Sequence, residues 1–303
     1  MQKKYWTICV MALVCTVVVG GCNNMSVKQD PSTTFEQVRD KFDSQNSYAF
    51  YGQTKLLTAN SSNANMVNFS GRKDGDAVYM NVKLSVPEEN RVDDVSLLRQ
   101  GEKLYTKDGQ NEGWKNVAGD SPALQQEMNN WSPIASFQQI DTMKRTVRML
   151  PDENPNDDFE ALGVVLDSAK LKSWLVAQMQ EQTKPGAKIQ AIPGREKPYI
   201  PKLKIAMSLS EGNWRGVPAR QSGSTIQSKK KVDINELVNQ MEVEAEYTIH
   251  YNKKTKLPTN LTMSIRSSYD LNDQRVKEHS QVETYLQQYG QVTPIPAPTE
   301  TRK

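Results

Sequence analysis

Cysteine and histidine are scarce in this chain. Its 303 residues include three cysteines and two histidines, and Cys9, Cys15 and Cys22 all lie close to the N-terminus. The long remainder therefore forms neither a disulfide nor a thiol-based site. The motifs of serine hydrolases, zinc proteases, P-loop proteins and dinucleotide-binding enzymes are absent as well. We expect a protein that is not an enzyme, with no catalytic residues, no cofactor, no metal and no nucleic-acid partner.

A long hydrophobic run is also missing. The apolar stretch from Ile8 to Val19 is shorter than the about 20 residues that a membrane-spanning helix needs. Two lysines precede it, which is the pattern of a secretory signal peptide. It ends in Val19-Gly20-Gly21-Cys22, which resembles a bacterial lipobox. We expect cleavage before Cys22 and attachment of lipid to its thiol; a plain signal peptide that happens to contain a cysteine is the alternative.

The lipobox predicts where the protein is located. Two acyl chains hold a protein firmly on a membrane, whereas one chain binds reversibly. We expect residues 1–21 to be the signal peptide and residues 22–32 a lipidated tether. The membrane is then a partner through the lipid anchor, and the folded domain lies on the extracytoplasmic face of the cell membrane.

Charge is distributed unevenly along the chain. Residues 183–232 contain eleven lysines and arginines against two glutamates, a net charge of +9, which leaves −8 for the rest of the chain after Cys22. The run Lys229, Lys230 and Lys231 is its densest part, and we expect it to contact anionic lipid or wall polymer. A solvated loop is one alternative. Another is internal neutralisation by the acidic stretches 152–158 and 242–246.

Alternating apolar residues predict a series of strands. In the stretch from Asp76 to Val86, the side chains of Val78, Met80, Val82 and Leu84 face one way. Phe50 lies on the apolar side of a strand that begins at Ser47, and Arg72 to Gly75 is expected to form a turn between these two strands. Further strands are expected at residues 95–100, 103–107, 114–117, 146–150, 159–166, 203–209, 242–251 and 261–265.

Helical spacing appears between the strands. Thr33 and Glu36 have capping-box spacing before the first helix, and residues 121–128 and 133–143 predict two more. Asp167 or Ser168 caps a stronger helix whose apolar side carries Leu171, Trp174 and Leu175. The order of elements predicts an α+β fold: one curved antiparallel sheet, a half-barrel, with helices packed on its concave face.

Three short motifs carry a resemblance to a known superfamily. They are a lipobox followed by a helix and the Ser47 strand, the strand Lys103-Leu104-Tyr105 leading to Trp114-Lys115, and the stretch from Tyr251 to Pro258. Together they resemble the LolA-like lipoprotein carriers and lipoproteins of the LppX and LprG type, over residues 34–290. In relatives the third motif has an acidic residue and a glycine where this chain has Asn252 and Lys256, so we expect a looser turn.

The resemblance implies binding of a lipid or another amphipathic ligand between the sheet and its helices. The implied pocket would be lined by residues of both layers: Phe50, Val78, Met80, Val82, Leu171, Trp174 and Leu175. Helices that simply close the core are the alternative. A non-catalytic scaffold that holds a protein partner of the cell envelope is the second functional class.

The predicted elements and motifs together indicate the domain organisation. We expect one domain over residues 33–292, with the basic segment 183–232 as an insert. Residues 293–303 contain three prolines and are expected to form a polar tail.

Overall fold

The computed structural model describes residues 30–58, 66–86, 91–109, 113–117, 128–129, 132–151, 158–183, 239–271 and 274–298. The predicted signal peptide, Cys22, most of the tether, the strand at 203–209 and the basic segment with Lys229, Lys230 and Lys231 lie outside these residues. Of the helix predicted at 121–128, Met128 is described, and its side chain is buried.

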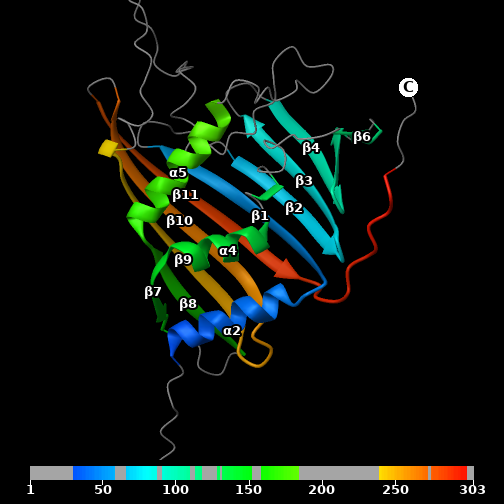
Figure 1. Ribbon diagram of the computed structural model, residues 1–303, viewed down its shortest axis with the longest axis horizontal. Coiled ribbons are helices and arrows are strands. Elements are labelled where there is room, and N and C mark those ends of the chain that lie inside the picture. The colour runs from blue at the N-terminus through cyan, green and yellow to red at the C-terminus, as the bar shows by residue number, and fades with distance from the viewer. Residues whose placement is uncertain are drawn as a thin grey trace, which may run out of the picture.

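Eleven strands form one antiparallel sheet. Its strand order is β6-β5-β4-β3-β2-β1-β11-β10-β9-β8-β7, and the sheet is open, with β6 and β7 at its edges. The strands are β1 (Ser47–Thr58), β2 (Met66–Asp74), β3 (Ala77–Val86), β4 (Arg91–Gln100), β5 (Lys103–Asp108), β6 (Lys115–Asn116), β7 (Lys144–Met149), β8 (Phe159–Leu166), β9 (Glu242–Asn252), β10 (Pro258–Leu271) and β11 (Gln274–Gln287). The predicted half-barrel is confirmed, and the first and last strands lie side by side at its centre (Figure 1).

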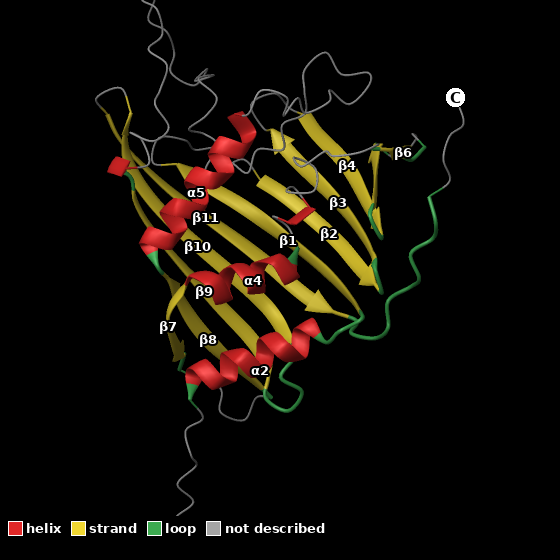
Figure 2. Ribbon diagram, viewed as in Figure 1, coloured by secondary structure: helices red, strands yellow, loops and turns green. Residues whose placement is uncertain are grey.

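The helices cover one face of this curved sheet (Figure 2). They are α2 (Pro31–Asp43), α4 (Pro133–Met143) and α5 (Ser168–Thr183). Their main contacts are with β7, β8 and β9, the half of the sheet beyond β11. The predicted α+β class, with helices on the concave face, is therefore what the chain adopts.

The inward face of the sheet is apolar because the side chains alternate. In β3 the side chains of Val78, Met80, Val82 and Leu84 are all buried, as the alternation predicted. In β9 every second side chain is buried, from Val243 to Tyr251. Two cross-strand glycines let the central strands approach closely: a Cβ on Gly52 would lie 2.4 Å from the Phe69 ring, and one on Gly71 would lie 2.4 Å from the Phe50 ring.

The first helix begins earlier than its sequence predicted. Asp30, not Thr33, is the N-cap, and its carboxylate accepts a hydrogen bond from the backbone N–H of Thr33 at 2.9 Å. Pro31 occupies the first helical position, where its missing N–H leaves no bond unmade. The buried face of α2 consists of Phe35, Val38 and Phe42, together with Thr34.

Two strands escaped prediction, and one expected turn is shorter than predicted. β2 and β11 were not predicted as strands, and Arg72 to Asp74, assigned to the turn, belong to β2. The turn itself is confined to Gly75 and its neighbour, and Gly75 has a φ of +57°, a conformation that favours glycine.

The turn after β9 is closed by hydrogen bonds to the Asn252 side chain. The Asn252 side-chain oxygen accepts hydrogen bonds from the backbone N–H groups of Lys254 and Thr255 at 3.0 and 2.9 Å, which is what an acidic residue would do there. Lys256 adopts a φ of +58°, the conformation that a glycine would take. Whether the turn is looser than in relatives stays a prediction.

Candidate ligand-binding site

The predicted pocket residues belong to one buried cluster, but they lie in different elements: some on strands β1 and β3 and others on helix α5. Phe50 on β1 and the trio Val78, Met80 and Val82 on β3 are buried on the inward face. Leu171 and Leu175 are buried on α5, and Trp174 is half-buried against the same cluster. Because the main contacts of α5 are with β9, a cavity that all seven residues share stays a prediction.

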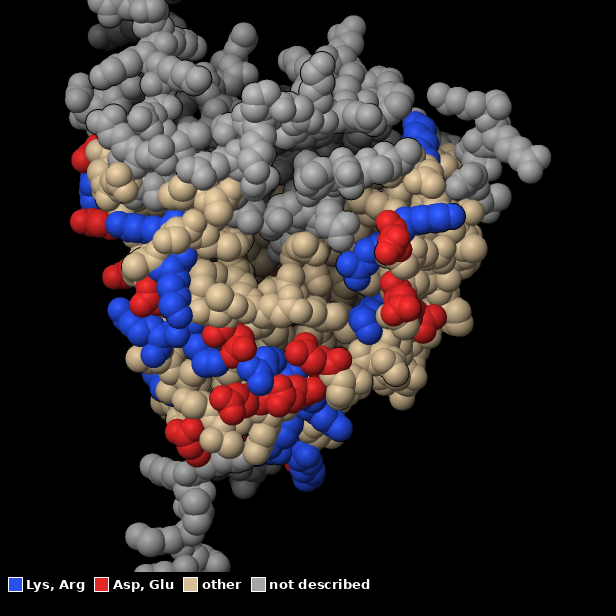
Figure 3. Space-filling model, in the orientation of Figure 1, with Lys and Arg blue, Asp and Glu red and all other residues tan. Residues whose placement is uncertain are grey.

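The inward face has two apolar flanks. On one side of the central strands lie inward residues of β2, β3 and β4, including Phe69 and Leu97, which are buried. On the other side lie inward residues of β8, β9 and β10, such as Leu162 and Ile249, also buried. The helices contact the second flank. Figure 3 shows that the described surface is hollowed near the centre of this face, where Figure 1 draws β1 and β11.

Polar side chains run along the centre of the same inward face. On β11 they are Glu278, Ser280 and Thr284, and on β1 the neighbouring one is Thr54; each is 9% exposed or less. Cross-strand pairing places Thr54 opposite Val282, between Ser280 and Thr284. We call these four residues the midline stripe. The sequence did not predict them, because β11 lacks the apolar alternation by which a strand is recognised.

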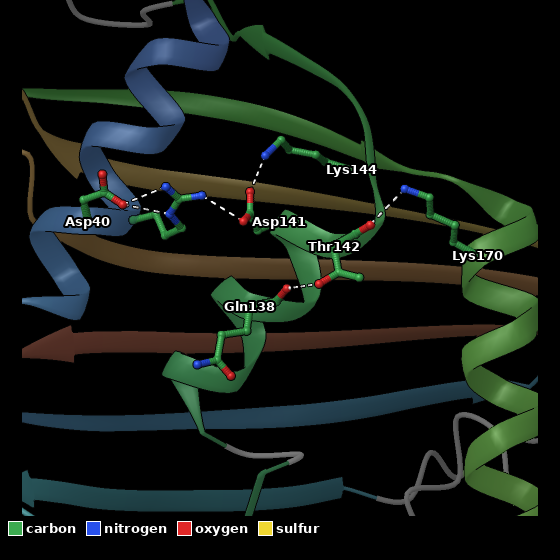
Figure 4. Close-up of polar contacts among 7 residues, drawn as sticks. Asp40, Gln138, Asp141, Thr142, Lys144 and Lys170 are labelled. Atoms are coloured by element: carbon green, nitrogen blue, oxygen red, sulfur yellow. Dashed lines mark hydrogen bonds and ion pairs between the residues drawn. The ribbon is translucent and has the colours of Figure 1, made fainter.

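Polar contacts among the helices fix α2, α4 and α5 relative to one another (Figure 4). Arg39 on α2 lies 2.8 Å from Asp40 and 2.8 Å from Asp141 on α4, and Asp141 also pairs with Lys144. The Lys144 ammonium, with Arg39, holds the pKa of Asp141 below its ordinary value. Lys170 on α5 donates to the Thr142 carbonyl at 3.0 Å, so all three helices are joined.

The capping of α5 follows the sequence. The Asp167 carboxylate accepts hydrogen bonds from the backbone N–H groups of Ala169 and Lys170, both at 2.9 Å. The pKa of Asp167 is lowered because these N–H groups favour the charged form. The predicted cap thereby sets the direction in which α5 crosses the sheet.

Four tyrosines are buried in the core, and three of them donate hydrogen bonds to polar partners at its borders. Burial raises their pKa values above the ordinary value. The hydroxyl of Tyr247 donates to Gln139 on α4 at 3.3 Å, that of Tyr251 donates to Glu160 at 2.5 Å, and that of Tyr289 donates to the Pro258 carbonyl at 2.5 Å. The fourth, Tyr48, packs on Phe42 with ring centroids 4.9 Å apart.

The outer face of the sheet carries an exposed aromatic pair on its two central strands. Tyr51 on β1 and Tyr285 on β11 are stacked with centroids 5.0 Å apart and an interplanar angle of 13°. They are 45% and 39% exposed. His250 on β9 is exposed on this face, and His279 lies 3.1 Å from the Ser264 hydroxyl.

The acidic strand β9 is paired within the described part of the chain. Glu242 lies 2.7 Å from Arg275 on β11, and Glu246 lies 2.6 Å from Arg148 on β7. Internal neutralisation of these two glutamates therefore uses arginines outside the basic segment. Whether the basic segment itself meets an anionic surface stays a prediction.

The inward face of the described sheet is apolar on its flanks and polar along its centre. They contain no group of three or more His, Cys, Asp or Glu side chains that could hold a metal ion. None of the helices in the described ranges is long and apolar enough to cross a membrane. What the inward face presents instead is apolar area on two flanks with hydroxyl groups between them.

Comparison with known proteins gives likeness in fold only. No family model matches the chain, and no curated protein matches it. Among solved structures it is similar to LprF from Mycobacterium bovis, at 10% identity and a TM-score of 0.36, over 89% of this chain and 97% of that one. It is also similar to a LolA superfamily protein from Nitrosomonas europaea, at 8% identity and a TM-score of 0.26, over 88% and 94%.

A third similar structure is a DUF1329 family protein from Desulfovibrio piger, at 8% identity and a TM-score of 0.26, over 86% of this chain and 93% of that one.

Proposed function

We propose that this protein is a lipid-anchored lipoprotein of the cell envelope that binds a lipid or another amphipathic ligand on the concave face of its half-barrel, and that it is not an enzyme. The observation that carries the proposal is the hollow over the centre of an apolar sheet face (Figure 3). Burying apolar surface gives about 25 cal/mol per Å², so an acyl chain laid along buried strands gains several kcal/mol. The β2–β4 flank, with the buried side chains of Phe69 and Met80, is the apolar floor beside this hollow.

The anchor is the second part of the proposal. The lipobox that ends at Cys22 supports a mature protein that begins there and stays on the extracytoplasmic face of the cell membrane. Labelling with radioactive palmitate should depend on this residue. Equal label in the wild type and in Cys22→Ala would refute the anchor without touching the ligand site.

The ligand site is tested by native mass spectrometry of the purified full-length Cys22→Ala protein, because this variant carries no covalent lipid that could be mistaken for a ligand. We expect complexes with one lipid molecule after purification from a lipid-containing host. We also expect dioctanoylglycerol, a short acylglycerol, to bind when it is added.

A matched pair of variants places the site. Val82→Thr puts a hydroxyl on the buried apolar floor and should weaken binding, whereas Lys83→Thr changes the next residue, which is exposed on the opposite face of β3, and should not. No co-purified lipid together with no binding of the added probe would refute the site. That result would favour the scaffold alternative.

A scaffold that holds an envelope protein is the second candidate, and the exposed Tyr51–Tyr285 pair supports it, because exposed aromatic side chains are enriched at protein interfaces. Replacing both tyrosines by serine should reduce cross-linking to envelope proteins if this candidate is correct. It should leave lipid binding on the opposite face unchanged.

The basic segment is proposed to orient the anchored protein on an anionic surface. Each lysine or arginine held near such a surface adds roughly 1 kcal/mol, and the effect decays over a Debye length of about 8 Å at physiological salt. Binding to anionic vesicles should therefore weaken steeply with salt and fall when Lys229, Lys230 and Lys231 are changed to Gln. Equal binding to neutral and anionic vesicles would show an ordinary solvated loop.

A further inference from the structure

Two cations lie at one end of the apolar β2–β4 flank. Cross-strand pairing on β1 to β4 aligns four residues in one row: Tyr48, Lys73, Val78 and Arg99. Tyr48 and Val78 are buried in the core, which places the row on the inward face, and the two cations are half-buried. Figure 3 shows lysine or arginine side chains beside the hollow, on the side where Figure 1 draws β2, β3 and β4. The apolar flank therefore ends in positive charge.

The Lys73 side chain is held in place by the backbone. Its ammonium group donates to the carbonyl oxygen of Gln45 at 3.1 Å and to that of Asn46 at 3.3 Å, in the connection between α2 and β1. Carbonyl groups carry no net charge, so these hydrogen bonds leave the positive charge of Lys73 without a balancing anion. Lys73 is therefore a fixed positive charge beside Val78.

The Arg99 guanidinium is available to a ligand. The ion pairs within the described ranges do not include Arg99. Burial and the Asp43 carboxylate raise the pKa of Tyr48, and the Arg99 guanidinium opposes this rise, so the guanidinium lies near the phenol. Because that phenol stays protonated at neutral pH, it is a hydrogen-bond donor beside the guanidinium. The planar fork of a guanidinium matches the two oxygens of a carboxylate or a phosphate.

The apolar floor begins one inward position from these cations. Met80 lies two residues from Val78 on β3, Leu97 lies two residues from Arg99 on β4, and both are buried. Residues two apart on one strand face are about 7 Å from each other. A ligand whose acyl chain covers Met80 and Leu97 therefore reaches Arg99 with its polar end.

We infer that Arg99 and the Tyr48 hydroxyl bind an anionic group, a carboxylate or a phosphate, of a ligand whose acyl chains lie on the β2–β4 flank. Lys73 supplies a second positive charge next to this group. Hydrogen bonds between two charged groups are stronger than those between neutral groups, so the site prefers an acidic lipid to a neutral one with the same chains. The inference rests on the proposed ligand site and specifies its ligand class.

Two lipids with the same acyl chains test the inference. Dioctanoyl phosphatidic acid and dioctanoylglycerol, which differ by one phosphate, are titrated calorimetrically into the purified full-length Cys22→Ala protein below their critical micelle concentrations. We expect the phosphatidic acid to bind about tenfold more tightly, the size of one hydrogen bond between charged groups. Adding Arg99→Gln should remove this preference and leave the affinity for dioctanoylglycerol unchanged. Inorganic phosphate alone should bind weakly, because it buries no apolar surface.

The matched control is Arg266→Gln, the same change at an exposed position on the outward face of β10, which should leave both affinities unchanged. Far-ultraviolet circular dichroism confirms that each variant is folded. Equal affinity for the two lipids before Arg99 is changed, or the same loss in Arg266→Gln as in Arg99→Gln, would overturn the anion site and leave the lipid site standing. Inorganic phosphate that binds as tightly as phosphatidic acid would overturn the link to a lipid ligand. No binding of either lipid would overturn both the inference and the proposed ligand site.

Discussion

Replacing Gly52 by alanine should destabilise the protein because no space exists for a methyl group at the centre of the sheet. A Cβ on Gly52 would lie 2.2 Å from the Glu283 carbonyl oxygen of β11 and 2.4 and 2.8 Å from two ring atoms of Phe69 on β2. The aromatic ring can turn away, but the carbonyl belongs to the backbone of the neighbouring central strand. The substitution must therefore move β11 against β1.

The size of the loss can be estimated. Overpacking a close-packed core costs about 1–3 kcal/mol, and the usual gain of about 0.4–1 kcal/mol from restricting the unfolded chain offsets part of it. We expect a net loss of about 2 kcal/mol in the free energy of unfolding. For a domain of this size that lowers the thermal midpoint by about 4–8 °C.

Urea unfolding followed by circular dichroism measures the change. The control is Gly163→Ala, where the added Cβ would meet only side-chain atoms of Arg148 and Leu150 at 3.0 Å or more, which can move aside. Adding Phe69→Leu to Gly52→Ala should restore part of the stability, because it removes the ring contact and leaves the carbonyl contact. A Gly52→Ala protein as stable as the wild type would refute the packing of β1 against β11 described here.

Three further predictions concern the borders of the core. Lys256→Gly should stabilise the protein by about 1 kcal/mol in urea unfolding. Lys256 has a left-handed backbone conformation, which costs a residue with a Cβ about 1–2 kcal/mol but costs glycine little. An unchanged or lower stability would contradict the turn geometry. Asp141 has a lowered pKa in the folded state, so its contribution to stability is present above about pH 4 and is lost as the pH falls through the folded pKa. The Asp141→Asn variant should therefore lose less stability on acidification than the wild type does. Identical stability–pH profiles of the two proteins would exclude the Arg39–Asp141–Lys144 contacts. Ultraviolet titration should find tyrosines that stay neutral above pH 10 until the protein unfolds, since burial raises the pKa values of Tyr48, Tyr247, Tyr251 and Tyr289. The contribution of these neutral tyrosines to stability is fully present below the unfolded pKa of about 10. It is lost as the pH rises further. Complete titration of all tyrosines near pH 10 in folded protein would contradict their burial.

The sheet could be predicted from sequence where one face is uniformly apolar. In β3 and β9 the buried side chains on the inward face are aliphatic or aromatic. Apolar residues at every second position of the sequence then identify the strand. The same reasoning found α5, because Asp167 is a strong cap followed by apolar residues at helical spacing.

The candidate site could not be predicted in the same way. The inward positions of β11 include both polar and apolar residues, such as Ser280 and Val282. Those of β2 include Gly71 and Lys73, so neither strand has an uninterrupted apolar period. A polar residue that faces inward looks, in the sequence, like one that faces water. Only the pairing of β11 with β1 shows that the hydroxyls face inward.

That pairing also bears on how the chain reaches its fold. Gln53 on β1 and Glu283 on β11 are 230 positions apart and are joined by a hydrogen bond of 2.7 Å. Contacts of such long sequence separation slow folding, because the entropy of closing the loop is lost before the contacts form. A chain shortened before β11 would leave two half-sheets, β6 to β1 and β10 to β7, with nothing to join them. The centre of this sheet can therefore form only after almost the whole chain has been made.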